Sequence, residues 1–246
     1  METIDLSGRR GLVVGVANAD SLAWSAARHF RNAGAELAMT YFSEKARPFV
    51  APLAEQVQAL LLPCNVLQEG QLEAVFETLR ERWGRLDFVF HSIASARKED
   101  LQGRLADCSG AGFAEAMLVS CHSLIRMAKL AEPLMRDGGS LTTVSYYGAE
   151  KVVEHYNVMG PVKAALEASV RYLAHELGPA RDPEPLVDRL HVVVHGIGRQ
   201  PERRRDLDVG RAGHRVLGDL ALARRERVVG RQLGAVEIAA GQALAA

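Results

Sequence analysis

The sequence contains little that would suit a disulfide-bonded or metal-binding protein. It has only three cysteines, Cys64, Cys108 and Cys121, and they form no CxxC pair. We therefore expect no disulfides, and a reducing, cytoplasmic environment. The histidines form no HExxH motif, and His191 and His195 flank a valine run that is typical of a strand. We expect no metal site.

The sequence also lacks net charge and long apolar runs. Its formal net charge is +0 at pH 7, so we expect no general attraction to nucleic acid or to an acidic membrane. No apolar run approaches the ~18 residues that would predict a membrane span. The N-terminal stretch "METIDLSGRRG" has no apolar signal-peptide core. What the chain does have is 246 residues, 48% of them hydrophobic, which suit a single α/β domain with a sizeable core.

Aromatic residues and lysine are absent from the C-terminal part of the chain. All of its Trp (2), Tyr (5) and Phe (7) residues lie at or before Tyr172. The last 66 residues contain no lysine but twelve of the 25 arginines. This shift in composition divides the chain into residues 1–180 and an atypical, arginine-rich segment of the same domain at 181–246.

Strand-like and helix-like segments alternate through the first part of the chain. Short β-branched apolar runs predict strands, and apolar residues three and four apart predict the helices between them. This alternation indicates an α/β, Rossmann-like, doubly wound parallel sheet, whose ligands bind beyond the carboxyl ends of the strands. The predicted strands are 11–17, 35–42, 59–66, 86–93 and 139–147, and the predicted helices are 21–33, 44–58, 69–84, 111–136 and 157–178.

Two of the turns that follow predicted strands have the character of a dinucleotide site. In "GVANADSLA" (15–23), Gly15 permits a tight turn, and Ser21 can cap a helix whose free amides favour a diphosphate. The full G-x-G-x-x-G pattern is absent, so a capped turn without a ligand is the alternative. In "FHSIAS" (90–95), Ser92 and Ala94 are small enough for a flat ring to approach the backbone, although a ligand-free turn fits these letters equally well.

The stretch "SYYGAEKVVEHYNVMGPVK" (145–163) carries the strongest catalytic pattern. Tyr146 and Tyr147 are adjacent at a strand end, so only one of them can line the cleft. Tyr156 and Lys163 are seven apart, which on a helix places them within ~20° of the same face and ~10 Å apart along the axis. The phenol can then donate to a substrate oxygen while the lysine holds a polyol and lowers the phenol's pKa. The alternative is a core tyrosine and a solvated lysine.

Together these motifs resemble the enoyl-[acyl-carrier-protein] reductases of bacterial fatty-acid synthesis, a group within the short-chain dehydrogenase/reductase superfamily. Ordinary members of the superfamily use Tyr-x3-Lys, whereas "YNVMGPVK", preceded by "SYYGAE", resembles the Tyr-x6-Lys form of the enoyl reductases. "GVANADSLA", "TYFSEKARPFV", "CNV" and "HSIA" are similar to the group's other motifs, in the same order. The resemblance covers about residues 5–180.

The resemblance implies a role for each matching residue. Tyr156 would hydrogen-bond the thioester carbonyl and stabilise the enolate oxygen that forms as hydride reaches the β-carbon. Lys163 would hold the hydroxyls of the nicotinamide ribose, and Tyr146 is the second active-site tyrosine. The implied cofactor is NADH, or NADPH, because no acidic residue or arginine after the second strand distinguishes the two. The residues that would contact it are Gly15, Ser21, Leu22 and Ala23 at the diphosphate, Asn65 and Val66 at the adenine, and Ser92, Ile93, Ala94 and Lys163 at the nicotinamide and its ribose.

Three positions depart from the family's pattern. Asn65 stands where the family usually has Asp, which keeps an acceptor but removes a charge and weakens dinucleotide binding modestly. Ala94 stands where many relatives have Gly, and Tyr147 replaces an aliphatic residue.

After "HELGPARD" the resemblance stops. "LHVVVHG" (190–196) suits a strand, but the family's Pro-Gly-Pro-Ile loop over the nicotinamide is missing, and "RRR" (203–205) stands where the substrate lid is expected. We hypothesise a shift of reading frame near residue 180. Codons for residues 180–183 and for "GHRVLG", read one base later, can spell Arg-Gly-Ile-Arg and Ala-Thr-Ala-Phe-Leu, which resemble the family's text. A genuinely diverged, basic segment is the alternative.

The sequence therefore predicts NAD(P)H-dependent reduction of the 2,3 double bond of trans-2-enoyl thioesters carried on acyl carrier protein. One alternative is a dinucleotide-binding homologue with impaired catalysis, because part of the pocket is missing. Another is a short-chain dehydrogenase acting on a carbonyl, which the Tyr-x6-Lys spacing opposes. The resemblance also implies a homo-oligomer, a tetramer in the family, assembled partly through the helices at 111–136 and 157–178.

Overall fold

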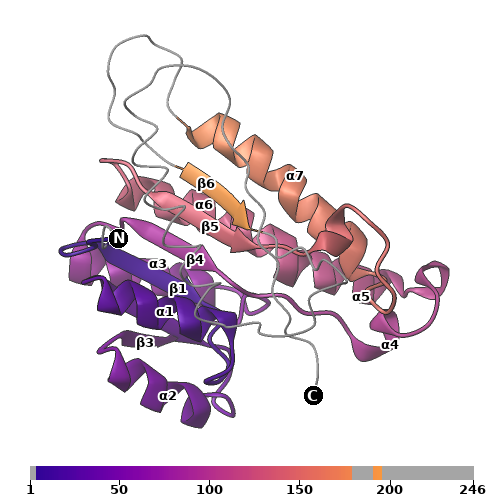
Figure 1. Ribbon diagram of the computed structural model, residues 1–246, viewed down its shortest axis with the longest axis horizontal. Helices are drawn as coiled ribbons and strands as arrows, with labels where there is room; N and C mark the ends of the chain where they lie inside the picture. Colours follow the sequence, from indigo (N-terminus) through magenta and orange to yellow (C-terminus); the bar gives the residue numbers. More distant parts are fainter. Residues whose placement is uncertain (1–3, 179–190, 196–246) are drawn as a thin grey trace.

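The computed structural model describes residues 4–178 and 191–195 of the chain. Six strands form one parallel sheet in the order β3-β2-β1-β4-β5-β6 (Figure 1). The direction in which successive strands are added reverses between β1 and β4, which creates a crevice beyond their carboxyl ends. The strands are β1 (Arg10–Val14), β2 (Glu36–Tyr41), β3 (Leu60–Pro63), β4 (Phe88–His91), β5 (Ser140–Val144) and β6 (His191–His195).

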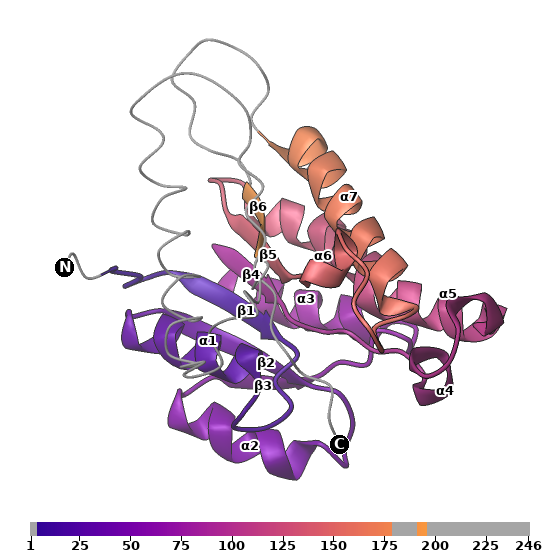
Figure 2. The ribbon, with the colours of Figure 1, turned by 45° about the vertical axis from the view of Figure 1, so that its right-hand side comes forward.

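Helices cover both faces of this sheet (Figure 2). One face carries α1 (Leu22–Asn32) and α2 (Arg47–Gln56). The other face carries α3 (Gln71–Trp83), α5 (Gly110–Met117), α6 (Ser123–Ala131) and α7 (Met159–Leu177). The shorter helical segments are α4 (Lys98–Leu101), η1 (Leu105–Asp107), η2 (Leu118–His122), η3 (Glu132–Leu134) and η4 (Tyr147–Ala149).

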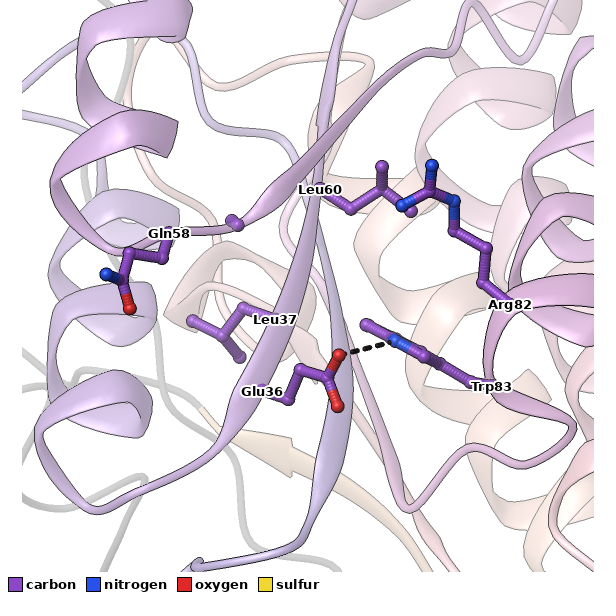
Figure 3. A pocket seen from close by; sticks show the side chains of 7 residues that line it. Glu36, Leu37, Gln58, Leu60, Arg82 and Trp83 are labelled. Atoms are coloured by element: carbon purple, nitrogen blue, oxygen red, sulfur yellow. Dashed lines mark hydrogen bonds between the residues drawn. The ribbon is translucent and has the colours of Figure 1, made fainter.

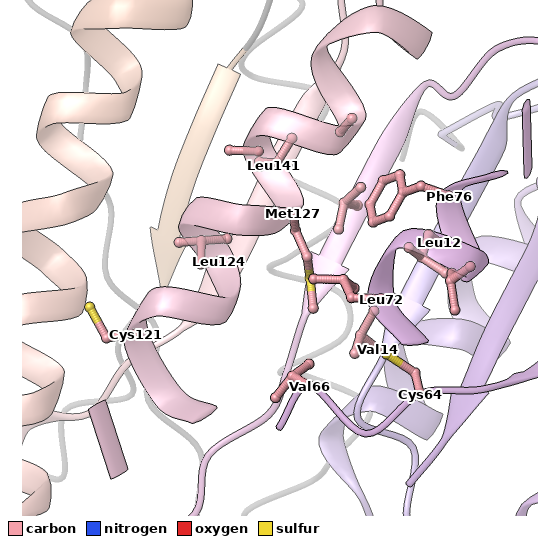
Figure 4. Close-up of a cluster of buried hydrophobic side chains, with 14 of the residues drawn as sticks. Leu12, Val14, Cys64, Val66, Leu72, Phe76, Cys121, Leu124, Met127 and Leu141 are labelled. Carbon is pink, nitrogen blue, oxygen red and sulfur yellow. The ribbon is translucent and has the colours of Figure 1, made fainter. Parts of the chain in front are cut away.

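The alternation of side chains along the strands builds a separate core on each face. In β1, Leu12 and Val14 enter the cluster under α3, α6 and α7, whereas Val13 enters the cluster under α1 and α2. Figure 4 shows the first cluster, where Leu12 and Phe76 approach from one side and Met127 from the other. These side chains are almost completely buried, so truncating any one to alanine would cost about 2–5 kcal/mol.

The helix predicted at 111–136 contains a π-helical turn. η2 joins α5 to α6 without a gap, and Ser123, the first residue of α6, donates from its hydroxyl to the carbonyl of Val119 at 2.6 Å. The turn aims Ser120 at the loop after β4, where its hydroxyl accepts from the amide of Ser95 at 3.0 Å. Turns of this kind are frequent at functional sites. The single-helix prediction missed it because apolar spacing alone does not mark an inserted residue.

The remaining predicted elements are confirmed with ends shifted by a few residues, and the α/β Rossmann-like class is confirmed. The strand predicted in "LHVVVHG" is also present, and β6 pairs with β5 in parallel. The predicted substrate-lid position, 203–205, lies outside the described residues. The division at residue 180 remains a prediction.

Candidate active site

The turns after β1 and β4 meet at the carboxyl edge of the sheet. Gly15 has φ +109, and a Cβ placed on it would lie 2.1 Å from the carbonyl oxygen of Ser92. The amide of Ser92 in turn donates to the carbonyl of Val14 at 2.9 Å. Only glycine allows this approach. Gly15 and Ser92, which were both predicted to contact the cofactor, are therefore brought together where the strand order reverses.

The amino end of α1 is free to receive an anion. Ser21 caps the helix, since its Oγ accepts from the amide of Trp24 at 3.3 Å and donates to the carbonyl of Asn18 at 2.8 Å. No acidic residue stands in the first turn of α1, although Asp20 precedes the cap, and the helix end carries a partial positive charge. Leu22 is half-buried and Ala23 is buried under the turn. This helix end fits the diphosphate of a dinucleotide, through amides more than through the Ser21 hydroxyl.

The turn after β3 is ordered by its own side chains. Asn65 Oδ1 accepts from the amide of Leu67 at 3.0 Å, and the amide of Asn65 donates to Gln71 Oε1 at 2.8 Å. Val66 is buried, and its carbonyl accepts from Arg126 Nη1 at 2.9 Å. An asparagine in place of aspartate therefore keeps the acceptor that shapes this turn.

The loop after β4 places Ser92, Ile93 and Ala94 on the same edge. Ser92 and Ile93 are half-buried and Ala94 is exposed. Their side chains are small or recessed toward the core, as close approach by a flat ring requires.

One of the two adjacent tyrosines packs on the catalytic candidate. The rings of Tyr146 and Tyr156 lie 4.7 Å apart, centroid to centroid, at an interplanar angle of 60°. Tyr147 begins η4 instead and is 38% exposed. The centroid of its ring lies 5.8 Å from Lys151 Nζ. Gly148 lies against the same pair, because a Cβ there would be 2.4 Å from Cδ1 of Tyr156. Gly148 was not predicted as a site residue, although it follows the tyrosine pair directly in the sequence.

Tyr156 does not stand on the helix that carries Lys163. It lies in a turn at 154–158, and α7 begins only at Met159. The residues on either side of it, His155 and Asn157, have positive φ values of 60° and 33°. The argument from a shared helical face was therefore wrong for Tyr156, because apolar spacing does not predict two left-handed residues before a helix.

Lys163 is buried beneath this turn. Its side chain points toward β5, where Nζ donates to the carbonyl of Val144 at 2.7 Å, and the residue is 5% exposed. Burial lowers the pKa of Lys163 to about 8. A solvated surface lysine, the alternative weighed from the sequence, is excluded.

A buried carboxyl group lies one helical turn beyond the lysine. Glu167 is 5% exposed and its Oε1 accepts from Ser145 Oγ at 2.6 Å. Burial raises the pKa of Glu167, and the bond from Ser145 offsets part of that rise. The sequence signal for Glu167 was its position four residues after Lys163, one turn along the same predicted helix.

The phenol of Tyr156 remains protonated at neutral pH. Burial raises its pKa, and the neighbouring Tyr146 and Glu167 raise it further. The expectation that Lys163 lowers this pKa is not met, since the ammonium is directed at Val144. A protonated phenol is nevertheless the form that donates a hydrogen bond to a substrate oxygen.

A buried histidine, His91, links β4 to β5 and to α6 through its ring nitrogens. His91 ends β4, and its ring nitrogens lie 2.7 Å from Thr143 Oγ1 and 2.8 Å from Ser123 Oγ. Burial and then the charge of Lys163 lower the pKa of His91 to about 3, so the ring is neutral. The sequence analysis assigned it no role, because its partners lie far along the chain.

A pocket of about 330 Å³ lies at the opposite edge of the sheet (Figure 3). Glu36 and Leu60, the first residues of β2 and β3, line it together with Trp83, whose Nε1 donates to Glu36 at 2.8 Å. It is therefore separate from the predicted site residues. Within residues 4–178 and 191–195, no group of three potential metal ligands is found, and no helix combines the length and apolarity needed to cross a bilayer.

Comparisons with known proteins match most of the chain to one family. A family model described as "Enoyl-(Acyl carrier protein) reductase" matches residues 15–181. An enoyl-[acyl-carrier-protein] reductase [NADH] 1 from Rhizobium meliloti (strain 1021) is 48% identical over 174 residues, which are 70% of this chain and 64% of that protein. The enoyl-[acyl-carrier-protein] reductase [NADH] FabI of Nostoc sp. is 45% identical over 179 residues, 71% of this chain and 69% of that protein. The match thus spans less than two thirds of the Rhizobium protein.

A solved structure shares the fold as well. The crystal structure of the reductase from Anaplasma phagocytophilum, in complex with NAD, has a TM-score of 0.78 and 40% sequence identity. The superposition covers 89% of this chain and 90% of that one. The strand order and the turn at Gly15 define a Rossmann-type dinucleotide-binding fold. Within that class, the chain belongs to the enoyl-[acyl-carrier-protein] reductase family.

Proposed function

We propose that the chain reduces the 2,3 double bond of trans-2-enoyl thioesters on acyl carrier protein, with NADH as the hydride donor, and that it acts in the cytoplasm. The observation that carries the proposal is the position of Tyr156, whose ring packs on Tyr146 just before the start of α7, the helix that carries the buried Lys163. Membership of the family supports it, and so does the NADH in the names of the two relatives.

In this proposal the nicotinamide supplies the hydride, and the protein positions the reactants and stabilises charge. Tyr156 donates a hydrogen bond to the thioester carbonyl, whose oxygen becomes an enolate oxygen as hydride adds to the β-carbon. A proton then adds to the α-carbon and completes the saturated thioester. Tyr146 holds the Tyr156 ring from one side and borders the acyl chain.

Lys163 is proposed to hold the nicotinamide ribose while keeping its bond to Val144. An ammonium group has three donors, so one can remain on the carbonyl and others can reach the ribose hydroxyls. The remaining contacts follow the sequence prediction: Gly15, Ser21, Leu22 and Ala23 at the diphosphate, Asn65 and Val66 at the adenine, and Ser92, Ile93 and Ala94 at the nicotinamide.

A second candidate is a dinucleotide-binding homologue with impaired catalysis. The end of the family match at residue 181 favours it, because the residues that follow are not matched to the family. An assay of NADH absorbance with crotonyl and longer 2-enoyl thioesters separates the two functions. Turnover by the purified full chain supports the reductase; NADH binding without turnover of any chain length supports the homologue.

We further propose that the chain forms a homo-oligomer through α5, α6 and α7. Large apolar side chains are exposed along these helices and the η2 turn between α5 and α6: Phe113 (40%) in α5, Leu118 (47%) in η2, Ile125 (36%) in α6 and Tyr172 (70%) in α7. Replacing Phe113 and Leu118 with serine should dissociate the assembly, as measured by sedimentation velocity. A sedimentation coefficient that does not change, or a wild-type monomer, would argue against this interface.

A further inference from the structure

The turn that carries Tyr156 has an unusual backbone. His155 and Asn157 both have positive φ values, 60° and 33°, although neither is glycine. Such conformations cost free energy and persist only where surrounding contacts hold them. Asparagine tolerates this region better than most residues.

The side chain of Asn157 supplies contacts of that kind. Its Nδ2 donates to the carbonyl of Leu101 at 2.5 Å and to the carbonyl of Gly103 at 2.9 Å. Both amide hydrogens therefore bind carbonyls at the end of α4 and just after it. Gly103, whose carbonyl accepts one of these bonds, itself has a positive φ of 94°.

Both carbonyls belong to the segment 95–109, which follows the proposed nicotinamide-contacting residues directly. The segment is tied to α5 by the ion pair of Arg97 with Glu115 at 2.7 Å, and to η2 by the bond from the amide of Ser95 to Ser120 Oγ at 3.0 Å. Within the segment, the Asp100 carboxylate accepts from the amide of Ser109 at 2.9 Å. Asn157 joins this segment to the turn before α7.

We propose that Asn157 is a positioning residue that couples the Tyr156 turn to the segment 95–109, a role that rests on the proposed reductase function. By holding two carbonyls of the segment, its carboxamide keeps the turn in its left-handed conformation and the phenol aimed at the carboxyl edge of the sheet. Asn157 acts through Tyr156 and does not itself touch the substrate.

Two substitutions separate the carboxamide from the backbone conformation. Asn157→Asp keeps the shape and the tolerance of positive φ but has no N–H to donate. Asn157→Gly adopts positive φ freely but has no side chain. Gln102→Ala is the matched control, because Gln102 is an exposed amide on the same segment.

The measurements are hydrogen exchange of the amides at 98–104 and 152–158, kcat with a 2-enoyl thioester, and the Kd of NADH, all on the full chain. We expect faster exchange of both regions in both Asn157 variants, and kcat lower by about 10- to 100-fold, with the Kd of NADH within about twofold. Gln102→Ala should resemble the wild type.

Wild-type exchange in both regions of both Asn157 variants would overturn the coupling, and so would faster exchange with unchanged kcat. Hydrogen exchange does not need turnover, so the two proposals can fail separately. If the wild type shows no turnover, the reductase function fails. The coupling then stands only if both regions lose protection together, and it falls if one exchanges faster without the other.

Discussion

Lys163 Nζ donates a 2.7 Å hydrogen bond to the main-chain carbonyl of Val144, so the lysine of the Tyr-x6-Lys motif is attached to the last residue of β5. A solvated lysine would have no fixed position relative to the sheet. Attached to β5 and almost fully buried, it holds its charge in a fixed position at the carboxyl end of that strand. This attachment makes its titration measurable as a change in stability.

The free energy of unfolding should rise between about pH 8 and pH 10.5 because of Lys163. Burial lowers its pKa in the folded chain from 10.5 to about 8. In this window the unfolded chain still binds a proton that the folded chain has released, so stability rises with pH, and the cost of the buried charge is fully present below pH 8.

The Lys163→Met variant lacks this titration. Relative to the variant, the wild type should gain on the order of 3 kcal/mol across the window, as measured by urea unfolding at a series of pH values. Parallel pH profiles for the two proteins would show that the buried lysine does not titrate there.

Tyr156→Phe should lower kcat by about 100-fold, since it removes one hydrogen-bond donor to the developing enolate oxygen. The ring contact with Tyr146 is kept, so the Tm and the Kd of NADH should change little. Tyr147→Phe is the control, because it removes the hydroxyl of a neighbouring, 38% exposed tyrosine, and it should behave as the wild type. Equal kcat for Tyr156→Phe and the wild type would remove the phenol from the mechanism.

Gly148→Ala should impair the site by crowding it. The new methyl group would lie 2.4 Å from Cδ1 of Tyr156 and 3.2 Å from Cδ1 of Tyr146. We expect a loss of about 1–3 kcal/mol in stability and a fall in kcat of about 10-fold or more. Gly110→Ala is the matched control, because nothing lies within 4 Å of a Cβ there. The measurements are kcat and the free energy of unfolding. Equal values of both for Gly148→Ala and Gly110→Ala would contradict the proposed crowding.

The gene should carry a one-base insertion or deletion near codon 180. The family match ends at residue 181, next to the point where aromatic residues and lysine disappear. Resequencing from independent amplifications tests this. A well-supported, uninterrupted frame through codon 246, conserved in independent clones, would instead establish a diverged C-terminal segment.

The sequence predicted those parts of the fold and site that depend on local pattern. Apolar periodicity was enough for the strand and helix order, and Gly15 and Ser21 were recognisable because a tight turn and a helix cap need those residue types. Partners that lie far apart along the chain were not predictable: His91 meets Thr143 across 52 residues, and Asn157 meets Leu101 across 56.

The Tyr156 turn illustrates the same limit. A helix from 157 was predicted, but the left-handed Asn157 delays the start of α7 to Met159. That conformation depends on carbonyls of another segment, and no local propensity encodes it. Burial likewise lowers the pKa of Lys163. That burial depends on how α7 packs on the sheet, which the local sequence does not show.

The most direct test of the proposed activity is the transfer of deuterium from NADH labelled at both C4 positions to a 2-enoyl thioester by the purified full chain. Mass spectrometry locates the label in the product. The account predicts a saturated thioester with one deuterium on the β-carbon, and little of it with Tyr156→Phe. Recovery of unlabelled, unsaturated thioester from a protein that binds NADH would contradict it.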